Sequence, residues 1–344
     1  MSRHSADTTY EAAEETNRRA LKGYKEVLGS EHPLTLTSVS NLAQVLQHQG
    51  KYEAADEMNR RALKGREMAL GSEHPDTLKS VSNLALMLMS QGKYEAADEM
   101  NRWALKGCEK ALGPDHPDTL VSVSNLALVL QYQGKYEAAE EMDRRALKGR
   151  EKVLGPEHPD TLTSVSNLVQ VLRCQGKYEA ADEMNRRALK GREMALGSEH
   201  PDTLMSVNNL ALVLMSQGKY DAAEETNRRA LKGCEKALGP EHPDTLTSVG
   251  NLALVLQYQG KYEAAEEMDW RALKGREKAL GPEHPDTLSS VWSLAKLHRA
   301  RHQHEAAMKL FERAHLGFMK RLGPSHPVTV ECFKQWTALR EQRQ

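Results

Sequence analysis

The sequence is poor in aromatic residues, in long apolar runs and in any excess of one charge. Aromatic residues make up 5% of its 344 residues, and 47 basic residues nearly balance 48 acidic ones. This balance argues against nucleic acid or an anionic membrane as a partner, because both select basic surfaces. No apolar run approaches the roughly 20 residues that a membrane-spanning helix needs. We therefore expect no nucleic-acid partner and no membrane association.

Cysteine is scarce, and the first residues lack the features of a secretory signal. The four cysteines form no Cys-x-x-Cys pair. From Met1 onward the chain enters a polar helical pattern instead of the apolar stretch of a signal peptide. Unpaired thiols without a signal peptide predict a reduced, cytoplasmic protein.

Proline is confined to one kind of segment, which recurs at a fixed interval. All 13 prolines lie in turns of the type Gly-(Ser/Pro)-Glu-His-Pro. Proline breaks a helix interior but fits its first turn, so each His-Pro pair predicts the start of a helix. A second marker, Gly-Lys-Tyr followed by an acidic residue and Ala-Ala, lies between these turns. Both markers repeat every 42 residues; the histidines are His32, His74, His116, His158, His200, His242, His284 and His326, and the glycines are Gly50, Gly92, Gly134, Gly176, Gly218 and Gly260.

Each repeat predicts two antiparallel helices. In one repeat the first, helix A, runs from about Pro117 to Gln133, and the second, helix B, runs from about Lys135 to Leu154. A glycine recurs inside helix B, as at Gly149, where it costs roughly 1 kcal/mol relative to alanine. It marks either a helix crossing that leaves no room for a side chain or repetition without a packing role.

The core positions of the repeat carry a family resemblance. They resemble the tetratricopeptide repeat, and the 42-residue period, the long helix B and the linker before each His-Pro look like its kinesin light chain subclass. Near-identical arrays are also similar to those that end fungal signalling proteins of the NB-ARC type. The resemblance implies an all-α, right-handed α-solenoid (superhelix) of antiparallel helix pairs whose helices A line a concave groove. The matching positions in one repeat are Val123, Leu126, Ala127, Leu130, Gly134, Tyr136, Ala139 and Ala146, whereas Asp143 replaces the family's large aromatic residue.

The repeat predicts the organisation of the whole chain. After a short lead of residues 1–7 and an orphan helix B at 8–31, we expect seven helix pairs and a C-terminal capping helix at 326–344. The unpaired first helix suggests a longer ancestral protein or a truncated gene model, and it offers a surface for end-to-end self-association. Repeats that are three apart match best, which indicates duplication of a three-repeat block. The pairs are predicted at 32–73, 74–115, 116–157, 158–199, 200–241, 242–283 and 284–325.

The recurring histidines do not predict a metal site. Zinc needs three or four ligands within about 2.0–2.3 Å of one ion, whereas consecutive repeats lie roughly 10 Å apart, the thickness of a packed helix. We expect these histidines to cap helices or to pack in turns, and we assign the cluster His298, His302 and His304 to a polar cap. Phosphate-binding loops and GxSxG or HExxH motifs are missing as well. We therefore predict no active site, no metal and no cofactor.

Helix A carries the residues that we expect to bind a partner. An asparagine recurs at one position, and its amide offers the donor and the acceptor that a peptide group needs; a similar asparagine ladder in the superhelix of O-GlcNAc transferase grips peptide backbone. Alternatively, each asparagine bonds to a neighbouring helix. Apolar residues on the same face predict apolar anchors in the ligand. The candidate residues are Asn41, Asn83, Asn125, Asn167, Asn209 and Asn251, with Leu86, Met89, Leu128, Tyr132, Arg173, Met205, Leu212, Met215, Leu254 and Tyr258.

The leading hypothesis for function is therefore a non-catalytic scaffold that binds a peptide or protein in the groove, and that could serve as the recognition array of a larger signalling receptor. A kinesin light chain-like cargo adaptor is the second hypothesis, although the motor-binding coiled coil of that family is missing from this sequence. A self-assembling structural array is the third.

Overall fold

The computed structural model describes residues 7–341, and every element in that range is an α-helix. Residues 1–6 of the predicted lead and residues 342–344 of the predicted capping helix lie outside the described residues. The helices are α1 (Asp7–Leu28), α2 (Pro33–His48), α3 (Tyr52–Leu70), α4 (Pro75–Ser90), α5 (Tyr94–Leu112), α6 (Pro117–Tyr132), α7 (Tyr136–Leu154), α8 (Pro159–Cys174), α9 (Tyr178–Leu196), α10 (Pro201–Ser216), α11 (Tyr220–Leu238), α12 (Pro243–Tyr258), α13 (Tyr262–Leu280), α14 (Pro285–Ala300), α15 (His304–Leu322) and α16 (Pro327–Glu341).

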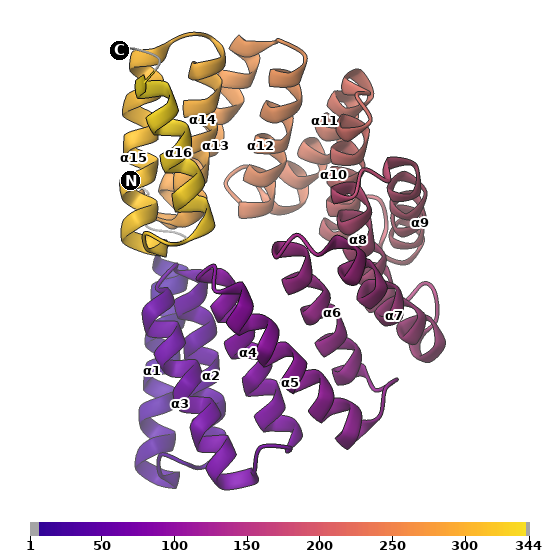
Figure 1. The fold of residues 1–344 in the computed structure, drawn as a ribbon, viewed down its shortest axis with the longest axis vertical. Helices are drawn as coiled ribbons and strands as arrows, with labels where there is room; N and C mark the ends of the chain where they lie inside the picture. Colours follow the sequence, from indigo (N-terminus) through magenta and orange to yellow (C-terminus); the bar gives the residue numbers. More distant parts are fainter. Residues whose placement is uncertain (1–6, 342–344) are drawn as a thin grey trace. The chain divides into compact units, whose positions relative to one another are not determined.

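The helices alternate between the two kinds that the sequence predicts. Even-numbered helices begin at the proline of a His-Pro pair and are helices A, and odd-numbered helices are helices B. Figure 1 shows them as successive antiparallel pairs. The predicted all-α solenoid of helix pairs with a 42-residue period is confirmed.

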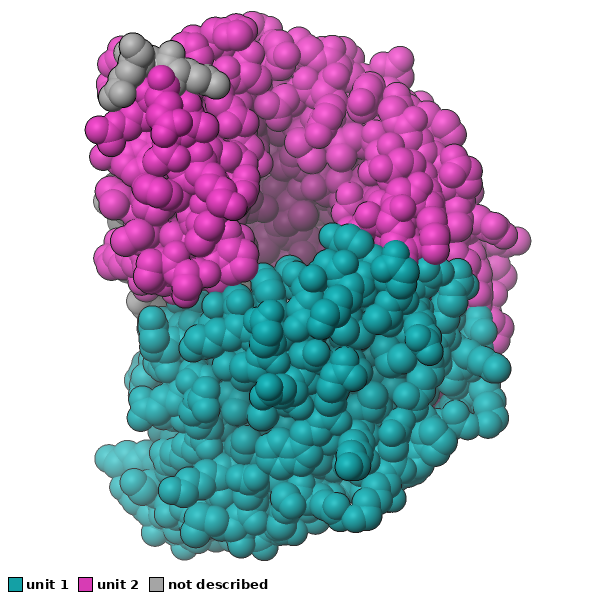
Figure 2. Space-filling view, in the orientation of Figure 1, with its two compact units in different colours: residues 1–153 teal, residues 154–344 magenta. Residues whose placement is uncertain are grey.

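The chain forms two compact units, residues 1–153 and residues 154–344, which Figure 2 colours separately. In the first unit α2 contacts α3 and α4 contacts α5, and in the second unit each helix A from α8 to α14 contacts the helix B that follows it. Helices A also contact one another, α2 with α4 and α4 with α6 in the first unit, and α8 with α10 and α10 with α12 in the second. The faces of successive helices A are therefore neighbours within each unit. None of the described helices is both long and apolar enough to cross a bilayer.

The recurring histidines cap the helices A. The backbone N–H of Asp118 donates a hydrogen bond to His116 Nδ1 at 3.2 Å, which satisfies one of the N–H groups that a helix start leaves unpaired. The same bond occurs at the start of every helix A from α2 to α14, and Val328 donates it to His326 at the start of α16. The capping role predicted for these histidines is confirmed.

The glycine inside helix B lies at a close helix crossing. A Cβ atom built on Gly149 would lie 2.5 Å from Leu120 Cδ2, and Leu120 is buried. The equivalent glycines from Gly65 to Gly317 meet the corresponding leucine in the same way, whereas a Cβ on Gly23 would meet nothing within 4 Å. The packing interpretation therefore holds for seven of these glycines and fails for Gly23.

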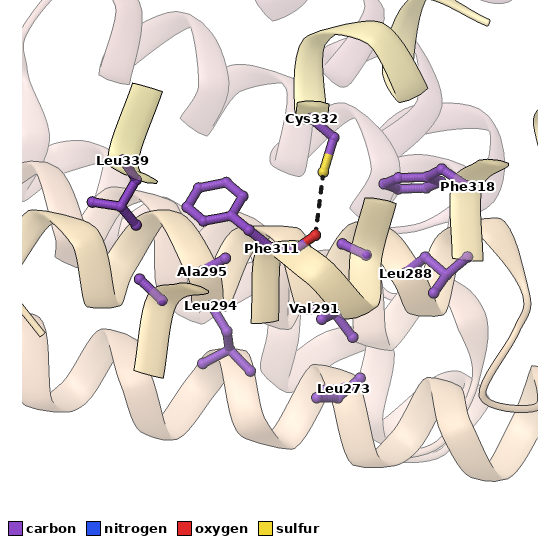
Figure 3. Packing of buried hydrophobic residues seen from close by; sticks show 11 residues of the cluster. Leu273, Leu288, Val291, Leu294, Ala295, Phe311, Phe318, Cys332 and Leu339 are labelled. Atoms are coloured by element: carbon purple, nitrogen blue, oxygen red, sulfur yellow. Dashed lines mark hydrogen bonds between the residues drawn. The ribbon is translucent and has the colours of Figure 1, made fainter. Parts of the chain in front are cut away.

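The last helix pair has a core of its own. All three phenylalanines of the chain lie between residues 311 and 333, and Phe311 and Phe318 of α15 are buried among Leu288, Val291 and Leu294 of α14 (Figure 3). The Cys332 thiol of α16 donates a hydrogen bond to the Phe311 carbonyl at 3.9 Å. The sequence predicts a polar cap here, but its interior is aromatic.

Candidate peptide-binding groove

The predicted asparagine ladder lies on the neighbouring faces of the helices A. Three of its members belong to the first unit, on α2, α4 and α6, and three to the second, on α8, α10 and α12. Asn41 is exposed and the other five are half-buried. Within residues 7–341 none of the six side-chain amides forms a hydrogen bond, so the alternative in which each amide bonds to a neighbouring helix is not observed. The ladder members are Asn41, Asn83, Asn125, Asn167, Asn209 and Asn251.

A second polar row lies beneath the ladder, on the helices B. Asn185 is fully buried, and its Nδ2 donates to the Ser206 carbonyl at 2.9 Å. The equivalent Asn101 and Asn227 are also fully buried, and no side-chain or backbone group of the described chain bonds to either amide. From the sequence, only the replacement of an aromatic residue at this position is evident. The row consists of Asn59, Asn101, Asp143, Asn185, Asn227 and Asp269, and all six are buried.

Two members of this row are carboxylic acids. Burial raises the pKa of both Asp143 and Asp269 to about 7, because a charge that leaves water loses its hydration. Ser293, which replaces asparagine in the ladder of the last repeat, bonds to Asp269 and opposes this rise, as does the charge of Lys296. The same burial and the nearby Arg299 lower the pKa of Lys296.

Two cavities open between successive helices A of the first unit. One of about 120 Å³ lies between α2 and α4 and is lined by Asn41, Asn83 and Asn59, together with Ser40, Gln44, Gln47 and Leu86. A larger one, of about 210 Å³, lies between α4 and α6 and includes Asn83 and Asn125 in its lining. In this unit ladder asparagines therefore line both cavities.

Most of the predicted apolar residues are accessible. Tyr132 and Tyr258 expose 57% and 58% of their surface, and Leu128 and Met205 each expose 39%. Leu86, Leu212, Met215 and Leu254 are half-buried. The expectation is wrong for Met89, which exposes only 8% because it packs into the core cluster that contains Leu63, Leu84 and Leu88.

The two exposed tyrosines are held in place by stacking. The Tyr132 ring stacks on Tyr94, the first residue of the preceding helix B, with ring centroids 5.4 Å apart. Tyr258 stacks on Tyr220 in the second unit at 5.7 Å. Each pair presents one rigid aromatic face at the C-terminal end of a helix A. The charged candidate, Arg173, is partly occupied, since its Nε donates to Gln170 Oε1 at 3.1 Å.

Arginines from the helices B lie between successive helices A and bond to both. The sequence did not predict these contacts. Arg66 of α3 is buried, and its Nη1 donates to Ser40 Oγ on α2 at 3.2 Å and to Ser80 Oγ on α4 at 2.5 Å. Arg192 of α9 bonds in the same way to Ser166 and Ser206. The available signal was that four repeats have Arg at this position and two have Cys.

Elsewhere on the described chain, ion pairs and one open hollow are the main polar features. Among the described residues no three His, Cys, Asp or Glu side chains lie close enough to hold a metal ion. His298 is buried rather than exposed in a polar cap, and its Nε2 lies 3.7 Å from Glu266 Oε1. The helix-B face carries ion pairs such as Arg144–Glu140 at 2.8 Å, and an open hollow of about 910 Å³ lies beside the exposed Trp270.

Comparison with known proteins identifies the fold family. A tetratricopeptide repeat model matches residues 5–68, 39–110, 76–152, 121–194, 201–278 and 250–315. No curated protein matches the chain. Among solved structures, a Podospora anserina kinesin light chain with nearly identical TPR-like repeats is 28% identical, with a TM-score of 0.51, over 60% of this chain and 97% of that one.

Two more distant structures share the fold alone. BtubC from P. vanneervenii is 24% identical with a TM-score of 0.56, over 68% of this chain and 94% of that one. A Rap protein, solved in complex with competence and sporulation factor, is 12% identical with a TM-score of 0.54, over 96% of this chain and 98% of that one. Because the family model spans most of the sequence, this chain belongs to the tetratricopeptide repeat family.

Proposed function

We propose that the chain is a non-catalytic, cytoplasmic scaffold that binds an extended peptide segment along the faces of its helices A. The observation that carries this proposal is the asparagine ladder, whose six amides are accessible and form no hydrogen bond within the described chain. Polar side chains that are partly withdrawn from water normally find partners. A peptide backbone supplies both the donor and the acceptor that an amide needs.

The spacing supports an extended ligand. Successive helix pairs lie roughly 10 Å apart, and an extended chain advances about 3.3 Å per residue. One asparagine can therefore meet every third residue of the peptide. Leu128, Tyr132, Met205 and Tyr258 then supply apolar contacts for side chains of the ligand.

A selection from a random peptide library, displayed on phage, tests this proposal. Asn167→Ala, Asn209→Ala and Asn251→Ala together remove the ladder of the second unit. Each lost hydrogen bond costs about 0.5–1.5 kcal/mol, so peptides that bind there should lose about 10- to 1,000-fold in affinity. Trp270→Arg is the matched control, because arginine stands at this position in the five preceding repeats and the residue lies on the helix-B face.

The two variants separate the possible outcomes. Loss of binding by the ladder variant, with helicity and the control unchanged, supports the proposal. Equal binding by parent and ladder variant, together with loss in the Trp270→Arg protein, would assign recognition to the helix-B face and contradict it.

A kinesin light chain-like cargo adaptor is a second candidate, favoured by the 28% identity to a kinesin light chain with similar repeats. It uses the same groove, so it differs in partner rather than in mechanism.

Self-association is a separate prediction. Val27 at the end of α1 exposes 81% of its surface and lies beside the exposed Leu28. Mass measured over a range of concentrations, for the parent and for Val27→Glu, checks whether this end joins two copies.

A further inference from the structure

Two of the crevices between successive helices A, those that hold Arg66 and Arg192, follow one design. An arginine of the intervening helix B enters the crevice and donates hydrogen bonds to one serine on each helix A, as Arg66 does to Ser40 and Ser80. Asp76, ten residues after Arg66, lies close enough to favour the charged arginine. Asp202 does the same for Arg192. Each such crevice is thus a binding site for a guanidinium group, and an arginine of the chain itself occupies it.

The crevice between α4 and α6 lacks its arginine. Helix α5 carries Cys108 at this position, and the shorter side chain leaves the cavity of about 210 Å³. This is several times the volume of one water molecule, roughly 30 Å³. The cavity reaches the groove, because the exposed Val121 and the ladder residues Asn83 and Asn125 line it.

A second crevice with a cysteine has been filled in another way. Between α10 and α12 the residue is Cys234, but Asn208 occupies the place of Ser82. Asn208 is buried, and its Nδ2 donates to Ser248 Oγ at 2.7 Å, which bridges the two helices A. The two crevices lie 126 residues apart in the repeat and differ in whether their polar groups are bridged from within.

The polar groups of the α4–α6 crevice are those that receive an arginine elsewhere. Ser82 and Ser122 correspond to Ser40 and Ser80. Ser122 Oγ donates to the Asp118 carbonyl at 3.1 Å and lies 3.6 Å from Cys108 Sγ, so one lone pair remains to accept from a ligand. Ser80 likewise donates to the Asp76 carbonyl while it accepts from Arg66.

The charges of this crevice favour a cation. Asp76, Asp118 and Lys79 all line it, two negative groups and one positive, so their formal sum is −1. Lys79 is exposed on α4, at a position where the other repeats have an uncharged residue. Leu78, Leu86 and Leu112 add apolar walls for the stem of a long side chain.

We propose that the crevice between α4 and α6 is a specificity pocket for an arginine side chain of the bound peptide. The guanidinium takes the place that Arg66 and Arg192 occupy in their own crevices and donates to Ser82 and Ser122, with Asp118 beside it. This assignment rests on the proposed function in one respect, that the arginine belongs to a bound peptide. The pocket itself is a property of the first unit.

Thiol modification of the intact chain tests the pocket directly. In a Cys174→Ser background, which removes the exposed thiol, a small alkylating reagent is added and the modification of Cys108 and Cys234 is followed by peptide mass spectrometry. Both thiols are buried, and burial raises the pKa of both, so their intrinsic reactivities are matched. Cys108 should react faster than Cys234, because its crevice is open.

The probes are the N-acetyl, N-methylamide derivatives of arginine, lysine and norleucine. The arginine probe should slow modification of Cys108 about twofold when half of the pockets are occupied, and it should leave Cys234 unchanged. Ser82→Asn copies the filled crevice and should bring the rate of Cys108 down to that of Cys234 and abolish protection. Asn208→Ser should open the other crevice and raise the rate of Cys234.

Two results would contradict the assignment of an arginine to this crevice. Equal rates for Cys108 and Cys234 in the parent, or equal protection by the norleucine or lysine probe, would overturn the arginine assignment. The variant Asn167→Ala/Asn209→Ala/Asn251→Ala leaves this crevice intact. If it still shows arginine protection but also still binds every selected peptide, the groove proposal fails while the pocket stands. If peptides require the ladder but no arginine protection occurs, the pocket fails alone.

Discussion

In the repeats from α2 to α13 the helix-B residue that lies beneath the ladder is Asn or Asp, whereas in α15 the same position is Phe311. The Arg or Cys position changes likewise, to Phe318. The regular repeats thus place polar groups between their helices A, and the last pair fills the same space with aromatic rings. Polar crevices cost stability unless their groups are bonded. Their presence in the regular repeats and their loss in the last pair mark where the proposed binding surface ends.

The largest test of this contrast is Phe311→Asn, which gives the last pair the residue of a regular repeat. Loss of a fully buried aromatic side chain costs about 3–5 kcal/mol, and the introduced amide adds a polar group to an apolar core. Denaturant unfolding and amide exchange of α14–α16 should show this loss. An unfolding free energy equal to that of the parent would mean that the aromatic core does not stabilise this end.

The buried acids predict a dependence on pH in the regular repeats. Asp143 has a pKa of about 7 in the folded chain and about 3.9 when unfolded. Below about pH 4 the acid is protonated in both states, so stability carries no penalty; between pH 4 and 7 the unfolded state loses its proton first, and stability falls. Asp143→Asn should therefore stabilise the chain by about 1–3 kcal/mol at about pH 8 and hardly at all at pH 4.

The reciprocal control is Asn101→Asp, which should introduce the same loss of stability with rising pH. Thermal unfolding followed by circular dichroism at the two pH values measures both variants. A stabilisation by Asp143→Asn that is equal at both values would show that the carboxylic acid is not the cause.

Glycine packing should be common to the regular repeats and the last pair. Gly149→Ala and Gly317→Ala each place a methyl group within 2.5 Å of a buried leucine and should cost about 1–3 kcal/mol. Gly23→Ala meets open space and should gain up to about 1 kcal/mol from helix propensity. Melting temperatures of the three variants check the difference in sign. A gain at Gly149 would remove the packing argument.

The smallest expected effect is the loss of one histidine cap. His116→Ala removes the acceptor of the Asp118 N–H, and His326→Ala removes that of Val328, so each should cost about 0.5–2 kcal/mol. Similar losses in urea unfolding would extend the capping rule to the divergent end. If only one of the two substitutions lowers the unfolding free energy, the histidine cap stabilises the helix at that end of the chain alone.

The fold could be predicted from sequence because its signals recur, His-Pro before every helix A and Gly-Lys-Tyr before six of the seven helices B that follow. Each His-Pro pair begins a helix, each Gly-Lys-Tyr segment begins the next one, and Val123 and Leu126 lie in the core as their helical spacing requires. A signal that is repeated leaves little room for an alternative assignment of elements.

The site was less accessible to sequence reasoning, because it depends on contacts between repeats. Met89 and Met215 occupy equivalent positions, yet one is buried and the other half-buried. The cavity beside Cys108 depends on Ser82, whereas Asn208 bridges the matching crevice beside Cys234. Such differences involve side chains on two helices at once, and spacing along one helix does not reveal them.

The central claim, that the ladder amides bind peptide backbone, is tested most directly by NMR with asparagine-selective ¹⁵N labelling. Titration with a peptide selected from the library should shift the side-chain amide signals of the ladder asparagines and leave those of the buried Asn101 and Asn227 in place. Shifts that avoid the ladder while the peptide binds would contradict the account and place recognition elsewhere on the chain.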